Sequence, residues 1–171
     1  IWNRWLSWLY VQQKEFSKAF IQEKAVYRRS SESLQDLFNL AVLAKEQKAY
    51  QTSNRVFEFI IQNSTDKRFH ILANCELLEL KQDLVEDSKS YKEIRTTYLE
   101  LIDRYNLGQQ SIDIQLSYAN FLAFYDNNLE GASEFLKTAL KENLSDLTAA
   151  KLKMKLADVL VVQNKFNQAL V

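Results

Sequence analysis

Apolar residues recur along most of the chain at the three-to-four-residue spacing of an amphipathic helix. The pattern is clearest in three stretches, Leu37-Leu40-Ala41-Ala44, Val56-Phe57-Ile60-Ile61 and Leu136-Ala139-Leu140. Because about 3.6 residues complete a helical turn, this spacing places the apolar side chains of each stretch on one face. Every strongly patterned segment indicates helix, so we predict an all-α protein without strands.

Short polar clusters separate the apolar stretches and supply side chains that can cap helix ends. They lie at 30–33, 63–66 and 143–146 and consist mostly of Ser, Asn and Asp. Ser90 and Glu93 match a capping box, in which the serine accepts from a free backbone N–H and the glutamate reaches back to the cap. We therefore predict helices of about 12 to 18 residues that short turns join into antiparallel hairpins.

A large residue followed three positions later by a small or aliphatic one recurs near the predicted start of each hairpin's second helix. The pairs are Phe16/Ala19, Tyr50/Ser53, Tyr91/Ile94, Leu129/Ala132 and Phe166/Ala169. Phe16 and Tyr50 lie 34 positions apart. A second pair recurs in the first helix, at Leu6-Ser7, Leu40-Ala41, Leu72-Ala73, Ala119-Asn120 and Leu156-Ala157. The interval between the two motifs is longer in the third repeat, which predicts an insertion near 81–90.

These motifs resemble the tetratricopeptide repeat (TPR), whose 34-residue unit is a helical hairpin. Leu6, Ser7 and Tyr10 stand at the L-G-x-x-Y positions of its first helix. Two pairs, Ser53/Phe57 and Ala132/Leu136, stand at the A-x3-F positions of its second helix. Small residues allow paired helices to approach closely, and the large residues fill the groove that remains.

The resemblance implies a right-handed α-α superhelix, a TPR-like solenoid of stacked antiparallel hairpins over the whole chain. The repeats would be 1–33, 34–66, 67–110 with the insertion near 81–90, 111–147, and a truncated 148–171. The sequence departs from the TPR pattern at several points. The terminal Pro is absent from every repeat, Glu23 replaces the aromatic residue of the first repeat, and Glu76 replaces the first-helix Tyr of the third.

Composition and charge exclude several classes of function. The 22 basic residues balance the 22 acidic ones, so nothing electrostatic favours binding to DNA or RNA. With no Pro and only two Gly, the chain cannot build a Gly-rich phosphate loop or a dinucleotide-binding fingerprint. The single Cys excludes a disulfide scaffold and a zinc finger but leaves the compartment open. No apolar run reaches the roughly 18 residues of a membrane span.

The residues that catalysis or metal binding would need are scarce. His70 is the only His, and the repeat pattern places it in a groove or on the surface. Cys75 is expected to be a buried small hydrophobic residue. The acidic stretch Glu76, Glu79, Asp83, Glu86 and Asp87 lacks the spacing and the glycine of a calcium loop, which favours a solvated helix end and loop over a divalent-cation site. We predict no catalytic residue, no metal and no cofactor, and therefore no enzyme.

In a TPR solenoid the first helix of each hairpin lines a concave groove. The implied groove positions are Arg4, Trp8, Phe38, Val42, His70, Asn74, Ser117, Phe121, Phe124 and Met154. Large rigid side chains on such a surface serve as anchors for a bound peptide. Trp8, Phe38 and Phe121 are therefore candidate partner contacts, the alternative being that they pack between hairpins. The Lys-and-Asn carboxylate clamp of some TPR domains does not map onto this chain.

The resulting hypothesis is a non-catalytic scaffold that binds a protein or peptide partner in the groove. The alternative is a structural spacer that positions flanking domains. Because the chain begins with Ile1 and ends within an apolar run, we expect an excerpt of a longer repeat protein. Apolar residues lie near both ends, which predicts either further hairpins or end-to-end self-association: Trp2, Trp5 and Leu9, and Leu160, Val161, Ala169 and Leu170.

Overall fold

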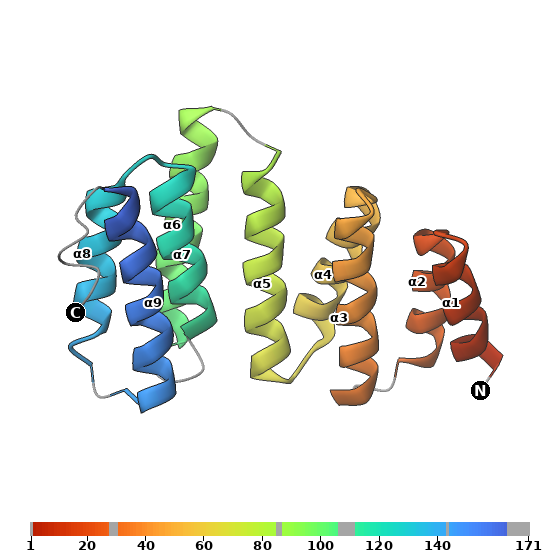
Figure 1. Ribbon diagram of the computed structural model, residues 1–171. Coiled ribbons are helices and arrows are strands. Elements are labelled where there is room, and N and C mark those ends of the chain that lie inside the picture. The colour runs from red at the N-terminus through yellow and green to blue at the C-terminus, as the bar shows by residue number, and fades with distance from the viewer. Residues whose placement is uncertain (1, 28–30, 85–86, 106–111, 143, 164–171) are drawn as a thin grey trace. The chain divides into compact units, whose positions relative to one another are not determined.

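The computed structural model describes residues 2–27, 31–84, 87–105, 112–142 and 144–163, and these residues form helices and no strands. The all-α prediction is confirmed for them. The helices follow one another along the chain (Figure 1): α1 (Trp2–Gln12), α2 (Phe16–Val26), α3 (Ser31–Glu46), α4 (Tyr50–Asn63), α5 (Lys67–Gln82), α6 (Ser88–Tyr105), α7 (Ile112–Phe124), α8 (Leu129–Ala139) and α9 (Asp146–Val162).

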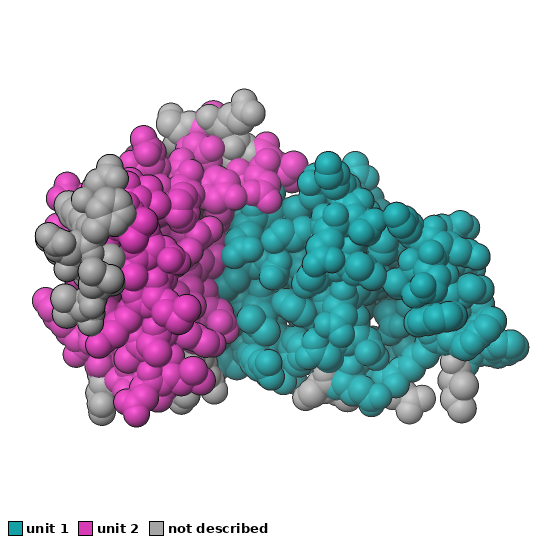
Figure 2. All heavy atoms as spheres, viewed as in Figure 1, with its two compact units in different colours: residues 1–80 teal, residues 81–171 magenta. Residues whose placement is uncertain are grey.

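The chain divides into two compact units, residues 1–80 (unit 1) and residues 81–171 (unit 2), which Figure 2 shows in different colours. In unit 1, α1 packs against α2, α3 packs against α4, and α2 also contacts α3. In unit 2, α7 packs against α8, α8 against α9, and α6 against α7. These consecutive helices are therefore neighbours in space, as in antiparallel hairpins.

Small residues lie where the two helices of a hairpin meet. Ala19 on α2, Ser53 on α4 and Ala132 on α8 have no exposed surface, and Ser7 on α1 is buried as well. One turn after Ser53, the large Phe57 is also fully buried and belongs to the hydrophobic core of unit 1. The absence of bulk at the small positions allows close helix packing, and the large residues fill the space beside them.

The third predicted repeat accommodates its additional residues largely by lengthening helices. α5 continues to Gln82 and α6 begins at Ser88, so much of the stretch predicted to hold the insertion is helical. α6 has 18 residues, whereas α2 and α8 have 11 each. The large repeat residue that begins α2, α4 and α8 is instead the fourth residue of α6, Tyr91. The repeat boundaries themselves stay predictions.

Polar side chains cap helices close to the predicted positions, with one correction. Asp66 accepts a hydrogen bond from the backbone N–H of Arg68 at 2.9 Å, and Ser145 accepts from that of Thr148 at 3.3 Å. The predicted capping box at Ser90 is wrong, because Ser90 lies inside the first turn of α6 and donates to Asp87 through its backbone N–H, at 2.9 Å, and its hydroxyl. These bonds lower the pKa of Asp87, since they favour its charged form.

The turns inside the hairpins use left-handed backbone conformations without glycine. Lys14, Lys48 and Asn127 have φ of 59°, 61° and 50°, and each lies two residues before the second helix of its hairpin. At the end of α3, Lys48 N–H donates to the carbonyl of Lys45 at 2.9 Å and Ala49 N–H donates to that of Ala44 at 2.8 Å. This pair of bonds is a Schellman motif, whose left-handed position usually holds glycine.

We predict that Lys48→Gly raises the free energy of unfolding by up to about 1 kcal/mol, because glycine adopts positive φ without the steric penalty of a Cβ. As a control, Arg55→Gly at an exposed position of α4 should lower it by about 1 kcal/mol. Urea unfolding followed by circular dichroism measures both changes. Equal losses in the two variants would contradict the left-handed assignment at Lys48.

Candidate functional site

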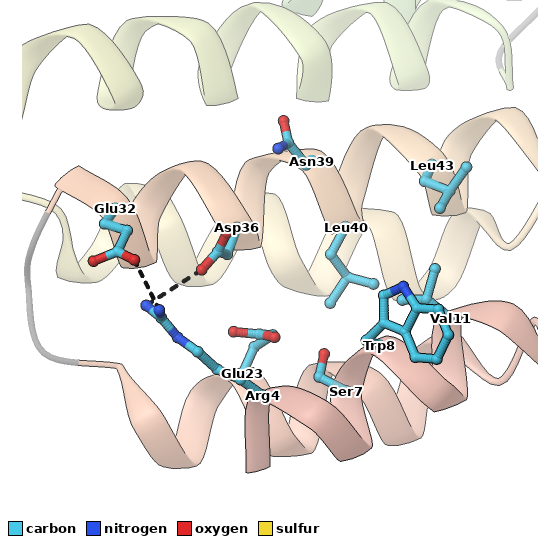
Figure 3. A pocket seen from close by; sticks show the side chains of 10 residues that line it. All are labelled: Arg4, Ser7, Trp8, Val11, Glu23, Glu32, Asp36, Asn39, Leu40 and Leu43. Carbon is cyan, nitrogen blue, oxygen red and sulfur yellow. Dashed lines mark hydrogen bonds and ion pairs between the residues drawn. The ribbon is translucent and has the colours of Figure 1, made fainter. Parts of the chain in front are cut away.

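A pocket of about 370 Å³ lies in unit 1, between α1, α2 and α3. Trp8 lines it and is 57% exposed. Figure 3 shows Arg4 and Trp8 at opposite ends of the pocket and Glu23 between them. The lining residues are Arg4, Ser7, Trp8 and Val11 from α1, Glu23 from α2, and Glu32, Asp36, Asn39, Leu40 and Leu43 from α3.

The pocket carries three carboxylates and one guanidinium. The guanidinium of Arg4 lies 2.8 Å from the Glu32 carboxylate and 3.4 Å from the Asp36 carboxylate. The hydrogen bond with Glu32, followed by the charges of Glu32 and Asp36, raises the pKa of Arg4. With every group ionised, two negative charges remain uncompensated among the lining residues.

Glu23 is the buried carboxylate of the pocket, with only 8% of its surface exposed. Burial raises the pKa of Glu23 because it disfavours the charged form. The hydrogen bond with Ser7 and the charge of Arg4 act in the opposite direction, while the charge of Asp36 adds to the increase. Glu23 departs from the TPR pattern, but the sequence pattern did not single it out as a site residue. The signal that could have identified Glu23 as a site residue is its carboxylate at a position that the repeat normally buries.

Of the three predicted anchors, Trp8 alone is both exposed and part of a pocket. Phe38 is half-buried, and its ring centroid lies 5.7 Å from that of Phe57 and 6.2 Å from that of Phe69. Val42 is partly buried against the same core. Phe38 therefore packs between helices of unit 1, and its role as a partner contact stays a prediction.

Phe121 and Ser117 are core residues of unit 2, so we correct their assignment to a partner surface. Phe121 is fully buried, with its ring centroid 5.7 Å from that of Tyr98 and 6.4 Å from that of Tyr118. The Ser117 hydroxyl lies 2.8 Å from the hydroxyl of Tyr98, which also accepts a hydrogen bond from the side-chain amide of Gln82. Both residues serve the internal packing of α6 against α7.

The remaining predicted positions are divided between the units. In unit 1, the Asn74 side-chain amide donates to the carbonyl of His70 at 2.7 Å and lies 3.1 Å from its ring Nδ1. In unit 2, Phe124 and Met154 are 51% and 70% exposed. Lys155 lies over the Phe124 ring, 5.6 Å from its centroid. That all these positions line one groove stays a prediction.

The acidic stretch is engaged with other side chains wherever the structure describes it. Glu76 and Glu79 lie 2.9 Å and 3.2 Å from the Lys45 ammonium, so they join α5 to α3. Burial acts to lower the pKa of Lys45, but the bonds and charges of the two glutamates outweigh it and raise that pKa. The side chains of these two residues are therefore only partly solvated, with 26% and 38% of their surface exposed. Asp83 accepts a hydrogen bond from the Tyr125 hydroxyl at 2.6 Å, and Glu86 lies outside the described residues.

Three further findings concern the chemistry of the described residues. Cys75 is buried, as predicted. No group of three or more His, Cys, Asp or Glu side chains in these parts of the chain is arranged to hold a metal ion. None of the helices that the structure describes combines the length and the apolar character that crossing a membrane needs.

Solved structures of MamA, a TPR-like protein, align along nearly the whole chain. A double mutant of MamA RS-1 gives a TM-score of 0.54 at 15% identity, covering 98% of this chain and 86% of that one. MamA AMB-1 gives a TM-score of 0.52 at 12% identity and covers 99% of this chain and 92% of its own. MamA MSR-1 gives a TM-score of 0.51 at 13% identity and covers 99% of this chain and 89% of its own. The chain has a TPR-like helical-repeat fold. No protein-family model matches the sequence, and no curated protein matches it.

The TPR-like fold explains why Glu23 is buried. Ala19 and Glu23 occupy the two positions of the second-helix motif, four residues apart on one face of α2. Ala19 has no exposed surface, so the residue one turn later also faces the packed side of the helix. Because the chain places a carboxylate where the repeat has an aromatic ring, a polar pocket takes the place of a filled core.

A second pocket in unit 1, of about 350 Å³, lies beside the turn between α1 and α2. Two of its lining residues, Ser17 and Thr52, are hydrogen-bonded to each other at 2.8 Å. Lys18, also in its lining, forms an ion pair with Glu15. These polar groups are paired with one another, so the pocket beside Trp8 is the stronger candidate for a ligand site.

Apolar side chains near the two ends differ in exposure. Trp2 and Trp5 on α1 are 74% and 51% exposed, and their ring centroids are 5.8 Å apart. On α9, Val161 is exposed but Leu160 is buried. Ala169 and Leu170 lie outside the described residues. Self-association through these side chains stays a prediction.

We predict that Phe121→Ala lowers the free energy of unfolding by about 3–5 kcal/mol, because it leaves a cavity in the core of unit 2. Phe124→Ala on the same helix should cost less than about 1 kcal/mol, since that ring is exposed and contributes mainly its contact with Lys155. Chemical denaturation of the full chain compares the two variants. Similar losses would contradict the different burial of the two rings.

Glu23→Gln should stabilise the protein by a few tenths to about 1 kcal/mol near pH 7, and by less near pH 4. A carboxyl group whose pKa is higher in the folded than in the unfolded state binds more protons when folded, so its contribution to stability falls as pH rises through that interval. Asp36 strengthens this effect and Arg4 weakens it. Denaturation from pH 4 to pH 8 measures the difference, with Glu134→Gln at an exposed position of α8 as the control. A pH-independent difference would refute the prediction.

Proposed function

We propose that this chain is a non-catalytic interaction scaffold of the TPR type, which holds a protein or peptide partner on the surface around Trp8. The observation that carries the proposal is the exposed indole of Trp8 beside the pocket of unit 1. A large rigid aromatic side chain loses little conformational entropy on binding, and tryptophan is prominent among residues that dominate interface energies. Exposure of such a side chain beside a cavity is typical of an interaction site.

Contacts within unit 1 support a preformed site. Arg4 links α1 to α3 through Glu32 and Asp36, and α2 packs against both of these helices. These contacts hold three helices around the cavity before any partner arrives. Binding would then order few additional side chains, which lowers its entropic cost.

The charge of the pocket favours some partners over others. Its three carboxylates oppose the approach of a polyanion, which agrees with the proposal that the partner is a protein or peptide and not a nucleic acid. The carboxylates also oppose an acidic peptide terminus, whose capture would need basic groups. The carboxylates do not repel a neutral or basic peptide surface.

A photo-crosslinking amino acid introduced at position 8 of the full-length protein tests the proposal. We expect it to capture a specific partner, whereas the same group at position 55, on the exposed side of α4, should not. Trp8→Ala should then weaken binding of the purified partner about tenfold or more, equivalent to at least about 1.4 kcal/mol. Trp5→Ala is the matched control, because Trp5 is an exposed tryptophan of α1 outside the pocket lining. Isothermal titration calorimetry measures both affinities.

Two outcomes would overturn the proposal. One is equal capture at positions 8 and 55, and the other is a captured partner whose affinity Trp8→Ala leaves unchanged. Either would favour the alternative, a structural spacer whose helices position flanking domains. Circular dichroism of each variant verifies that helicity is retained, so that loss of binding reports on the surface and not on folding.

A further inference from the structure

We infer that the pocket beside Trp8 receives an arginine side chain of the partner, with the guanidinium between the indole of Trp8 and the carboxylates of Glu23 and Asp36. This inference rests on the proposed function and specifies the chemistry of the partner. Three properties of the pocket carry it: its charge, its aromatic and apolar walls, and the guanidinium that it already binds.

The first property is the excess of negative charge. Glu32 and Asp36 share the guanidinium of Arg4, whereas Glu23 lies buried and forms no ion pair with it. A buried carboxylate has lost much of its hydration, and a cation entering the pocket would compensate for that loss. An incoming anion would add to the repulsion. The cavity therefore selects for positive charge.

The second property is the combination of walls, which matches a long cationic side chain better than a metal ion. Val11, Leu40 and Leu43 give the pocket apolar surface, along which the methylene groups of an arginine can pack. The Trp8 indole offers a face on which a planar guanidinium can stack, and tryptophan is the strongest aromatic partner for a cation. A metal ion would require oxygen ligands in place of these side chains. A volume of about 370 Å³ also lies within the range of ligand pockets.

The third property is that the pocket already binds a guanidinium from its own chain. Arg4 contacts carboxylates on two successive turns of α3, at 2.8 Å from Glu32 and 3.4 Å from Asp36. These contacts show that carboxylates of α3 can recognise this group. Arg4 is also a competitor, because it neutralises Asp36, which a partner's arginine would use. Removing Arg4 should therefore strengthen binding of an external guanidinium.

Binding of defined tripeptides to the full chain tests this inference. The probe is acetyl-Gly-Arg-Gly-amide, and its matched control is acetyl-Gly-citrulline-Gly-amide, which has nearly the same shape without the charge. The indole N–H signal of Trp8, assigned by comparison with Trp8→Phe, is followed by NMR. We expect a saturable shift with the arginine probe, at least about fivefold weaker binding with citrulline, and weakening of the arginine complex as salt is added.

Four variants assign the site. Glu23→Gln and Asp36→Asn should each weaken binding of the arginine probe at least about threefold, and Arg4→Gln should strengthen it by a similar factor. Glu134→Gln, an exposed carboxylate of unit 2, should leave it unchanged. Circular dichroism and a thermal melt verify that each variant is folded, and Glu23→Gln is itself expected to be at least as stable as the unmodified chain.

Equal binding of the arginine and citrulline probes, or arginine binding that neither Glu23→Gln nor Asp36→Asn weakens, would overturn the inference. Its failure is distinguishable from failure of the proposed function. If crosslinking at position 8 captures a partner through a segment without arginine, the scaffold function stands and this inference falls. If the arginine probe binds as expected but position 8 captures no partner, the preference of the pocket for an arginine side chain stands and the scaffold proposal falls.

Discussion

Close packing of paired helices is the constraint on which the rest of this structure depends. Ala19, Ser53 and Ala132 have no exposed surface, and each lies on the second helix of its hairpin. A larger residue at any of these positions would force the two helices apart, and the core on either side would lose contact. The hairpins therefore depend on small residues that bury little apolar surface themselves. These residues determine how closely the larger core side chains of the two helices can pack.

The same constraint gives Glu23 its properties. It follows Ala19 by about one turn of α2, so the packing that buries the small residue also removes water from the carboxylate. The protein meets this cost with the Ser7 hydroxyl and the nearby charge of Arg4, and burial still dominates. A single departure from an apolar repeat position thus accounts for a polar cavity within a helical stack, and for the raised pKa of the group inside it.

Much of this architecture could be predicted from the sequence, because small and large residues at helical spacing determine which helices pair. Helix caps were partly predictable, since Asp66 and Ser145 lie in polar clusters that interrupt the apolar pattern. The cap of α6 could not be predicted, because both Asp87 and Ser90 can cap a helix. Which of them does so depends on where the helix begins. The left-handed turns at Lys14 and Lys48 were also hidden, because lysine is not a residue that marks positive φ.

The orientation of α7 was the main feature that sequence alone could not supply. Nine of its 13 residues are buried, including Gln115 and Ser117, so the helix is enclosed on most sides and presents no single apolar stripe. Without a stripe, the repeat pattern gave no reason to place Phe121 inward. The α1 helix is the opposite case, because Ser7 is buried and Trp8 beside it is exposed. There the two sides of the helix are distinct, and Trp8 was selected from the sequence.

The single thiol of the chain has a practical consequence for measuring local opening around α5. Cys75 is 6% exposed within α5, so a reagent in solution gains access to its sulfur chiefly when the surrounding helices separate. Under conditions where reclosing is fast, the labelling rate is then proportional to the population of the opened form. No cysteine needs to be removed or introduced, so the natural sequence contains its own site-specific reporter of local unfolding.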